Sequence, residues 1–328
     1  MRPGLSESIV VVTGASSGIG RATALAFARE GAAVVVCARR EAPLESVVQQ
    51  CRSLGAEGLA VPADVRDETS MRAVARRALD RFGRIDVWVN NAGVGALGAF
   101  EAVPPDVFRG VIETNFFGCV HGTRAVLPHF TSQGHGVVVN VASMLGKMAM
   151  PYYTAYAAAK FAVVGFGETL REELIGTGVD VVTIMPASID TPFFEHSANY
   201  TGRAVKPPRP IYDPAEVAET IVRAAERPRR EVFVGGAARA MNVLHAVLPG
   251  LYEQAARSMT DYDHFQDRTA GPTPGAVLAP VASGTDVRGG WRTMRHEARR
   301  RPTRAVAIGT AIVLPAYLAL RALRRAAA

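Results

Sequence analysis

The chain is poor in cysteine, and its histidines do not cluster. Its three cysteines, Cys37, Cys51 and Cys119, show neither paired nor metal-ligand spacing, which argues against a disulfide framework and a cysteine-based zinc site. The seven histidines are scattered, and the Asp-Tyr-Asp-His run at 261–264 indicates a polar turn. A strand expected from about Ile9 leaves no room for a signal peptide. We therefore predict no metal and a cytoplasmic location.

Long apolar runs are also scarce. One neutral apolar stretch, Ala305–Leu320, has 16 residues and would span about 24 Å as a helix, against roughly 30 Å for a bilayer core. Arginines lie on both sides of it and suit anionic lipid headgroups. Two interpretations stay open: membrane contact through residues 292–325, either spanning or peripheral, or a terminal helix docked on the body or on a partner subunit.

The excess of positive charge is confined to the C-terminal tail. The net charge of the chain is +7, but residues 292–328 hold nine arginines and one glutamate. The remaining 291 residues therefore sum to −1. Because the body is nearly neutral, the basic composition is no sign of nucleic-acid binding, and we predict no nucleic-acid partner.

Seven Val-rich apolar runs alternate with helical patterns along the first 236 residues. Continuous apolar runs are typical of strands buried on both faces, as in parallel sheets. The alternation predicts an α/β fold, a Rossmann-type doubly wound sheet of seven parallel strands. The expected strands are Ile9–Thr13, Ala33–Ala38, Gly58–Pro62, Ile85–Asn90, Gly136–Val141, Val179–Met185 and Glu231–Val234. The expected helices are Ile19–Glu30, Leu44–Leu54, Glu68–Phe82, Pro105–Thr131, Tyr153–Thr177 and Pro214–Glu226.

The composition divides the chain into three segments. Residues 1–236 form the expected dinucleotide-binding catalytic domain, 237–290 a helical and then Gly/Pro-rich extension, and 291–328 an Arg-flanked apolar tail. Within the extension, Ala237–Met259 is expected to be helical and Thr269–Gly290 to be a linker.

A glycine turn follows the first expected strand. Residues Thr13–Gly20 read Thr-Gly-Ala-Ser-Ser-Gly-Ile-Gly and lead into an Ala-rich helical pattern. Glycines at 14, 18 and 20 allow a tight turn and a close approach of the backbone to a pyrophosphate. The free N–H groups at the start of the helix attract that anion. The turn therefore predicts a dinucleotide site.

A tyrosine and a lysine lie four residues apart, at Tyr156 and Lys160, and so share one helix face. A phenol has a pKa of about 10, and an ammonium within roughly 4–6 Å favours the phenolate. We expect Lys160 to lower the pKa of Tyr156, so that the phenol exchanges a proton near neutral pH. Ser143 stands thirteen residues before the tyrosine.

Together these motifs resemble the short-chain dehydrogenase/reductase family over roughly residues 6–236. The resemblance implies hydride transfer between a nicotinamide and a carbonyl or secondary alcohol, with four catalytic residues. In a reduction, Ser143 would hold the substrate oxygen and Tyr156 would donate a proton. Lys160 would also bind the nicotinamide ribose, and Asn115 would hold a water that joins Lys160 to solvent.

The resemblance also implies a set of cofactor contacts. One departure from the family pattern is Pro186-Ala187, where a glycine usually follows the proline. With the two arginines discussed next, the expected contacts are Gly14, Ser16, Ser17, Gly18, Ile19, Gly20, Arg39, Arg40, Asp64, Val65, Asn91, Ala92, Gly93, Tyr156, Lys160, Ile189 and Thr191.

The end of the second expected strand indicates which dinucleotide is bound. An NAD site typically has a carboxylate there for the ribose 2′-hydroxyl, but this chain has Ala38 followed by Arg39 and Arg40. A guanidinium can bind a 2′-phosphate with forked hydrogen bonds. We therefore predict NADP(H), with Arg39 as the main contact and Arg40 as support, and consider NAD(H) the weaker candidate.

The substrate is expected to be lipophilic. Residues 185–210 are read as a loop over the substrate pocket, and the apolar side chains assigned to the pocket are Met148, Tyr152, Tyr153, Phe193, Phe194 and Tyr200. The sequence leaves open the substrate itself, the direction of the reaction and the formation of a homo-oligomer. An alternative function is a non-catalytic, NADP-binding scaffold held at a membrane by the tail.

Overall fold

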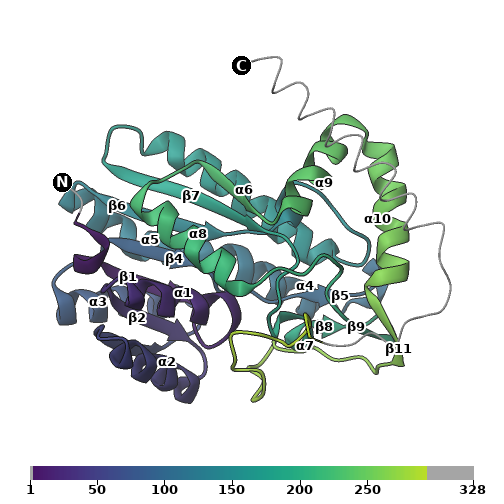
Figure 1. Ribbon diagram of the computed structural model, residues 1–328, viewed down its shortest axis with the longest axis horizontal. Coiled ribbons are helices and arrows are strands. Elements are labelled where there is room, and N and C mark those ends of the chain that lie inside the picture. Colours follow the sequence, from purple (N-terminus) through teal and green to yellow (C-terminus); the bar gives the residue numbers. More distant parts are fainter. Residues whose placement is uncertain (1–2, 294–328) are drawn as a thin grey trace.

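The computed structural model describes residues 3–293, and its centre is a seven-stranded parallel sheet (Figure 1). The strand order is β3-β2-β1-β4-β6-β7-β10. The predicted fold class is therefore confirmed. The strands are β1 (Ile9–Thr13), β2 (Ala33–Ala38), β3 (Gly58–Pro62), β4 (Val87–Asn90), β6 (Gly136–Val141), β7 (Val179–Pro186) and β10 (Glu231–Val234).

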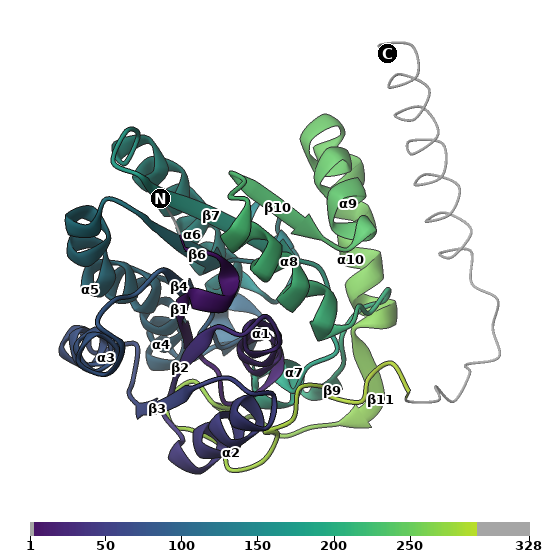
Figure 2. The same ribbon diagram turned by 60° about the vertical axis from the view of Figure 1, so that its left-hand side comes forward.

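Helices cover both faces of the sheet because successive strand side chains point to opposite faces. Val10 and Val12 of β1 belong to the core under α1, α2 and α8, whereas Val11 belongs to the core under α3, α5 and α6. Figure 2 shows the two helical layers. The helices of the first layer are α1 (Gly18–Arg29), α2 (Glu41–Ser53) and α8 (Pro214–Glu226), and those of the second are α3 (Glu68–Phe82), α4 (Pro105–Ile112), α5 (Gly118–Gln133) and α6 (Thr154–Glu173).

The helix predicted over Pro105–Thr131 is divided in the structure. A π-helical turn, η3 (Glu113–Phe117), separates α4 from α5. Such turns insert one extra residue per turn and often occur at functional sites. This turn contains Asn115 and brings it close to the segment that follows β4. The short 3-10 helices are η1 (Leu5–Glu7), η2 (Phe100–Ala102) and η4 (Met144–Gly146).

The loop predicted over the pocket contains short elements of its own. They are α7 (Phe193–His196), β8 (Ala198–Asn199) and β9 (Arg203–Val205). β8 pairs with β5 (Ala96–Leu97), and β9 pairs with β11 (Phe265–Thr269) of the extension. The loop is thus held from both sides by backbone hydrogen bonds.

The extension begins with two helices, α9 (Gly236–Val247) and α10 (Pro249–Asp263), which separate at Pro249 as the sequence predicted. The expectation of a linker over Thr269–Gly290 is wrong. Val277 is fully buried, and Trp291 is only 6% exposed. This segment, yellow in Figure 2, lies against the body because its backbone and Trp291 hydrogen-bond to the loop after β7.

Within residues 3–293, no helix is both long enough and apolar enough to cross a membrane. The membrane contact predicted for residues 292–325 falls almost entirely outside the described residues, which end at 293.

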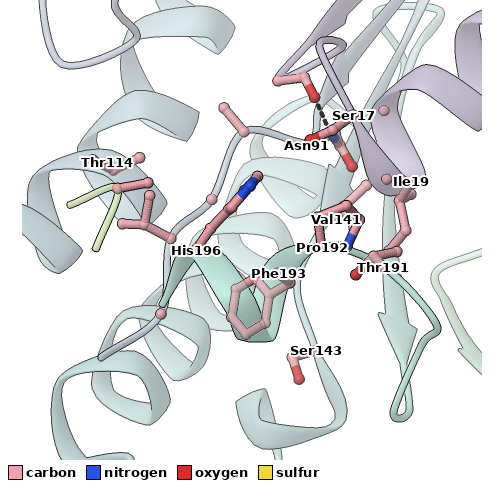
Figure 3. A pocket seen from close by; sticks show the side chains of 18 of the residues that line it. Ser17, Ile19, Asn91, Thr114, Val141, Ser143, Thr191, Pro192, Phe193 and His196 are labelled. Atoms are coloured by element: carbon pink, nitrogen blue, oxygen red, sulfur yellow. Dashed lines mark hydrogen bonds between the residues drawn. The ribbon is translucent and has the colours of Figure 1, made fainter. Parts of the chain in front are cut away.

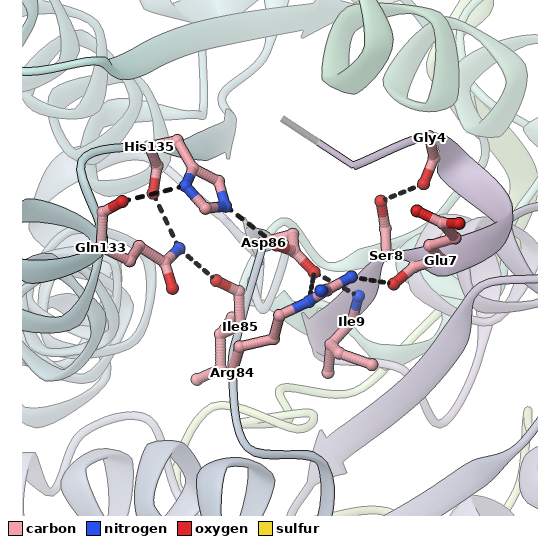
Figure 4. Close-up of polar contacts among 9 residues, drawn as sticks. All are labelled: Gly4, Glu7, Ser8, Ile9, Arg84, Ile85, Asp86, Gln133 and His135. Atoms are coloured by element: carbon pink, nitrogen blue, oxygen red, sulfur yellow. Dashed lines mark hydrogen bonds and ion pairs between the residues drawn. The ribbon is translucent and has the colours of Figure 1, made fainter. Parts of the chain in front are cut away.

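A polar network joins the amino ends of three strands, at the end of the sheet opposite the glycine turn (Figure 4). The buried carboxylate of Asp86 accepts a hydrogen bond from the backbone N–H of Ile9 at 2.8 Å. It also forms ion pairs with Arg84 at 3.1 Å and with His135 at 3.3 Å. The network therefore ties together the segments that precede β1, β4 and β6.

Candidate active site

A cavity lies at the carboxyl ends of the strands, where the strand order reverses between β1 and β4. Dinucleotides and their substrates bind at such switch points. In Figure 3, Ser17 and Ile19 lie toward one end of the cavity, Ser143 toward the other, and Phe193 between them. Every predicted catalytic and cofactor-contact residue except Asn115 lines this cavity.

The glycine turn fits the close approach that a dinucleotide requires. Gly14 has a φ of +66°, and a Cβ there would lie 2.6 Å from Cα of Ala92. A Cβ at Gly20 would lie 2.3 Å from the carbonyl oxygen of Gly14. Both positions therefore require glycine. The first residues of α1 line the same cavity, where a helix start favours an anion.

The turn is fixed to the neighbouring strand by Thr13 and Asn91. The hydroxyl of Thr13 accepts hydrogen bonds from the backbone N–H groups of Asn91, at 3.0 Å, and of Ala92, at 3.1 Å. The side-chain amide of Asn91 donates to the carbonyl oxygen of Thr13 at 2.9 Å. This reciprocal arrangement holds the segment 91–93 against the turn.

Ser143, Tyr156 and Lys160 converge at the other end of the cavity. Ser143 follows β6 and hydrogen-bonds to Tyr156 on α6. Lys160, one helical turn further along, is 4% exposed and donates from Nζ to the carbonyl oxygen of Val141 at 2.9 Å. Its Nζ lies 5.6 Å from the centre of the Tyr156 ring. The serine and the lysine thus flank the phenol.

The pKa of the phenol differs from the sequence expectation. Burial raises the pKa of Tyr156 to about 12, although the hydrogen bond with Ser143 acts in the opposite direction. Burial also lowers the pKa of Lys160 to about 8. The expected lowering of the tyrosine pKa by Lys160 is not seen, because both groups are removed from water and burial disfavours both charged forms. Tyr156 therefore keeps its proton at neutral pH.

Asn115 lies behind the cavity wall. Its side-chain amide donates to the carbonyl oxygen of Val94, and its oxygen accepts from the N–H of Val94, each at 2.8 Å. This pair fixes the segment after Gly93, where a Cβ would lie 3.0 Å from Asn115 Oδ1 and 3.6 Å from Lys160 Nζ. The role predicted for Asn115, holding a water beside Lys160, stays a prediction.

The two arginines after β2 line the cavity beside the glycine turn. Arg39 donates to the carbonyl oxygen of Ala276 at 2.7 Å, and Arg40 donates to those of Val281 at 2.8 Å and Ser283 at 2.9 Å. Asp64 is paired with Arg66 at 2.6 Å. No carboxylate occupies the end of β2, where Ala38 stands.

The substrate end of the cavity is apolar, but the sequence identified only part of it. Tyr153, Phe193 and Phe194 line the cavity, together with Met144, Leu145 and Met150, which the sequence analysis missed. Met148, Tyr152 and Tyr200 do not line it. Met148 is fully buried in the core, and Tyr152 packs edge-on against Phe265 of the extension.

His264 was also missed, and its interpretation as part of a polar turn is wrong. Its ring is fully buried, with Nε2 2.6 Å from the hydroxyl of Tyr153 and Nδ1 2.5 Å from the carbonyl oxygen of Lys206. Because a carbonyl only accepts, Nδ1 carries the proton. Burial lowers the pKa of His264 to about 4. The neutral ring therefore accepts from Tyr153 and fixes that side chain beside Tyr156. No local sequence pattern signals this pairing.

Ala187, the departure from the family pattern, is accommodated without strain. Its N–H donates to the carbonyl oxygen of Val234 at 2.9 Å. Room for its methyl group comes from Gly235, where a Cβ would lie 3.0 Å from Cβ of Ala187.

Comparison with known proteins agrees with this geometry. The family model for short chain dehydrogenase matches residues 8–200. The chain is 36% identical over 319 residues to the uncharacterised oxidoreductase YxnA of Bacillus subtilis (strain 168), which covers 94% of this chain and 90% of that protein. That likeness continues well past residue 200, into the extension.

Two solved structures show the same fold. An alcohol dehydrogenase from the archaeon Thermococcus sibiricus, complexed with 5-hydroxy-NADP, is 28% identical with a TM-score of 0.62, covering 69% of this chain and 95% of that one. A short chain dehydrogenase/reductase from Burkholderia phymatum, in complex with NAD, is 28% identical with a TM-score of 0.67, covering 75% and 95%. This chain belongs to the short-chain dehydrogenase family and is therefore an oxidoreductase. Its fold is the one that binds nicotinamide cofactors in the two structures above.

Proposed function

We propose that the protein is an NADP(H)-dependent oxidoreductase that transfers a hydride between the nicotinamide and a carbonyl or secondary alcohol of a lipophilic substrate. One observation carries the proposal: Ser143, Tyr156 and Lys160 line the same cavity as the glycine turn. The apolar lining beside Tyr156 favours a lipophilic substrate. Bound NADPH supplies the hydride.

The residues of the chain supply the proton and the orientation. In the reduction, the hydroxyl groups of Ser143 and Tyr156 hold the substrate oxygen between them. Tyr156 is the proton donor, because burial keeps the phenol protonated at neutral pH. Lys160, charged below about pH 8, stabilises the negative charge that develops on the phenol oxygen.

The preference for NADP(H) rests on charge. Arg39 and Arg40 line the cavity at the end of β2, and no carboxylate stands there to repel a 2′-phosphate. One related structure holds an NADP derivative and another holds NAD, so the arginines carry this argument. We expect Arg39→Ala to raise the KM for NADPH by at least about tenfold, the loss of one charge-assisted contact, and the KM for NADH by much less. Equal changes would contradict the preference.

Replacing Tyr156 with phenylalanine tests the chemistry. The variant should bind NADPH normally, measured by nucleotide fluorescence, and lose at least about 100-fold in kcat, since general acid catalysis contributes at least that much. The assay is NADPH oxidation with a panel of lipophilic ketones and aldehydes. Turnover by neither protein, with cofactor binding intact, would favour the alternative of a non-catalytic NADP-binding scaffold. Near-normal turnover by the variant would reject the acid role of Tyr156.

We propose further that the enzyme works in the cytoplasm, with residues 292–325 in contact with the membrane face. The apolar stretch and its flanking arginines support this proposal. A chain ending at Thr293 should move from the membrane fraction to the soluble one, and an unchanged distribution would reject it. A homo-oligomer is supported by two exposed side chains, Phe117 at the end of η3 and Phe161 on α6, and sedimentation velocity tests it.

A further inference from the structure

The C-terminal strap, residues 274–292, crosses the cavity beside the glycine turn. Ala276, Pro280 and Val281 line the cavity together with the glycine turn and the two arginines after β2. In Figure 2 the strap runs in yellow from β11 past α7 toward α2. Segments far apart in the sequence therefore form one wall of the cofactor site.

Both ends of the strap are anchored. At its start, the N–H of Ala276 donates to the carbonyl oxygen of His196 at 2.7 Å. At its end, the backbone N–H of Trp291 donates to Asp190 Oδ1 at 2.8 Å, and its indole N–H donates to the carbonyl oxygen of Thr191 at 3.0 Å. The indole also packs edge-on against Phe194. The end anchor thus holds the loop that contains the expected cofactor contacts Ile189 and Thr191.

The strap hydrogen-bonds to Arg39, Arg40 and the start of α1 through main-chain carbonyl oxygens. Those of residues 276 and 281–283 accept from Arg39 and Arg40, and that of Asp286 accepts from the N–H of Gly18 at 2.9 Å. Hydrogen bonds to a neutral carbonyl are weaker than those to a phosphate. The strap therefore holds these N–H donors in place. Each donor can still give up its carbonyl partner and hydrogen-bond to a bound anion instead.

We propose that the strap is part of the cofactor-binding site, closing over the 2′-phosphate end, and that Trp291 is the positioning residue that keeps it closed. The inference rests on the proposed binding of NADP(H). Cofactor release then requires the strap to open, and ordering Arg39 and Arg40 before binding reduces the entropy lost on association.

Trp291→Ala tests this proposal through the rate of cofactor release. Stopped-flow displacement of NADPH should give a dissociation rate constant at least about tenfold higher than in the unchanged chain, as for loss of a buried aromatic anchor. The KM should rise more for NADPH than for NADH, because the strap holds the arginines. Trp291→Phe, which keeps ring packing, should restore part of the effect. Tyr262→Ala, an exposed aromatic residue of α10 outside the strap, is the matched control and should change neither value.

A second variant covers the case in which Trp291→Ala fails to fold. Arg288 and Arg292 form exposed ion pairs with Asp213, at 3.0 Å and 2.7 Å. The double change Arg288→Ala/Arg292→Ala loosens the same end without touching the core. It should accelerate release by a smaller factor, and less so in high salt.

The outcomes separate this inference from the proposed function. Unchanged release rates in both strap variants, with Tyr156-dependent turnover intact, would overturn the strap's role alone. A merely structural role for Trp291 would lower the melting temperature and leave the ratio of the two KM values unchanged, which also overturns it. Failure of the unchanged chain to bind NADPH would reject the cofactor assignment and the strap proposal together.

Discussion

Replacing Lys160 with methionine should make the protein more stable at pH 7. Burial lowers the pKa of Lys160 from 10.5 to about 8. At about 1.36 kcal/mol per pH unit, holding the charged form in the folded state costs about 3 kcal/mol. The variant loses the hydrogen bond from Nζ to Val141, worth about 1 kcal/mol. We expect a net gain of about 2 kcal/mol in the free energy of unfolding.

This advantage should shrink as the pH rises. The pKa of Lys160 is lower in the folded state than in the unfolded state. Between pH 8 and 10.5 the lysine is therefore protonated in the unfolded state and neutral in the folded state. The free energy of unfolding of the unchanged protein rises with pH over that range. By pH 9.5 that gain is about 2 kcal/mol, which removes the advantage of the variant. Cys37, whose pKa burial raises to about 12, titrates in both proteins, so its contribution cancels in the difference.

Urea unfolding followed by circular dichroism at pH 7 and pH 9.5 measures both effects, provided that the m values agree. The kcat of the variant should fall by at least about 100-fold, since the ammonium supports proton transfer. A variant less stable than the unchanged protein at pH 7 would refute the reasoning. So would a difference in stability that does not change with pH.

Two further changes test the glycine turn and the Asp86 network at the amino ends of the strands. Gly20→Ala places a methyl group against the carbonyl oxygen of Gly14. Fluorescence titration should show a dissociation constant for NADPH at least about 100-fold higher. A dissociation constant within twofold of that of the unchanged protein would contradict the close approach of the backbone to the cofactor. Asp86→Ala leaves the N–H of Ile9 without its acceptor. The free energy of unfolding should fall by about 2 kcal/mol, and the KM for NADPH should not change. An unchanged urea midpoint would show that the network adds no stability.

The agreement between sequence and structure has a local cause. The strands from Ile9–Thr13 to Glu231–Val234 are apolar runs whose signal lies within a few neighbouring residues, and five of seven have the predicted bounds. The glycine turn could be predicted because glycine adopts the positive φ at position 14 more readily than any other residue. Tyr156 and Lys160 share a face by helical spacing alone. Local patterns therefore located the cavity.

The differences arise where segments distant in sequence meet. The division of the helix at η3 depends on the pairing of Asn115 with Val94, and the cavity lining depends on how η4 folds after β6. The raised pKa of Tyr156 depends on the side chains that exclude water around it. None of these has a local pattern.

The sequence by itself determined the parallel sheet, the glycine turn and the shared helix face of Tyr156 and Lys160, because each is encoded by residue type at short spacing. Only the tertiary structure decided that the Gly/Pro-rich segment is a strap, that His264 supports Tyr153 and that carbonyl oxygens of residues 276–283 hold Arg39 and Arg40. The physical reason is that these contacts join side chains or carbonyls far apart in the sequence, and main-chain carbonyls are the same in every residue.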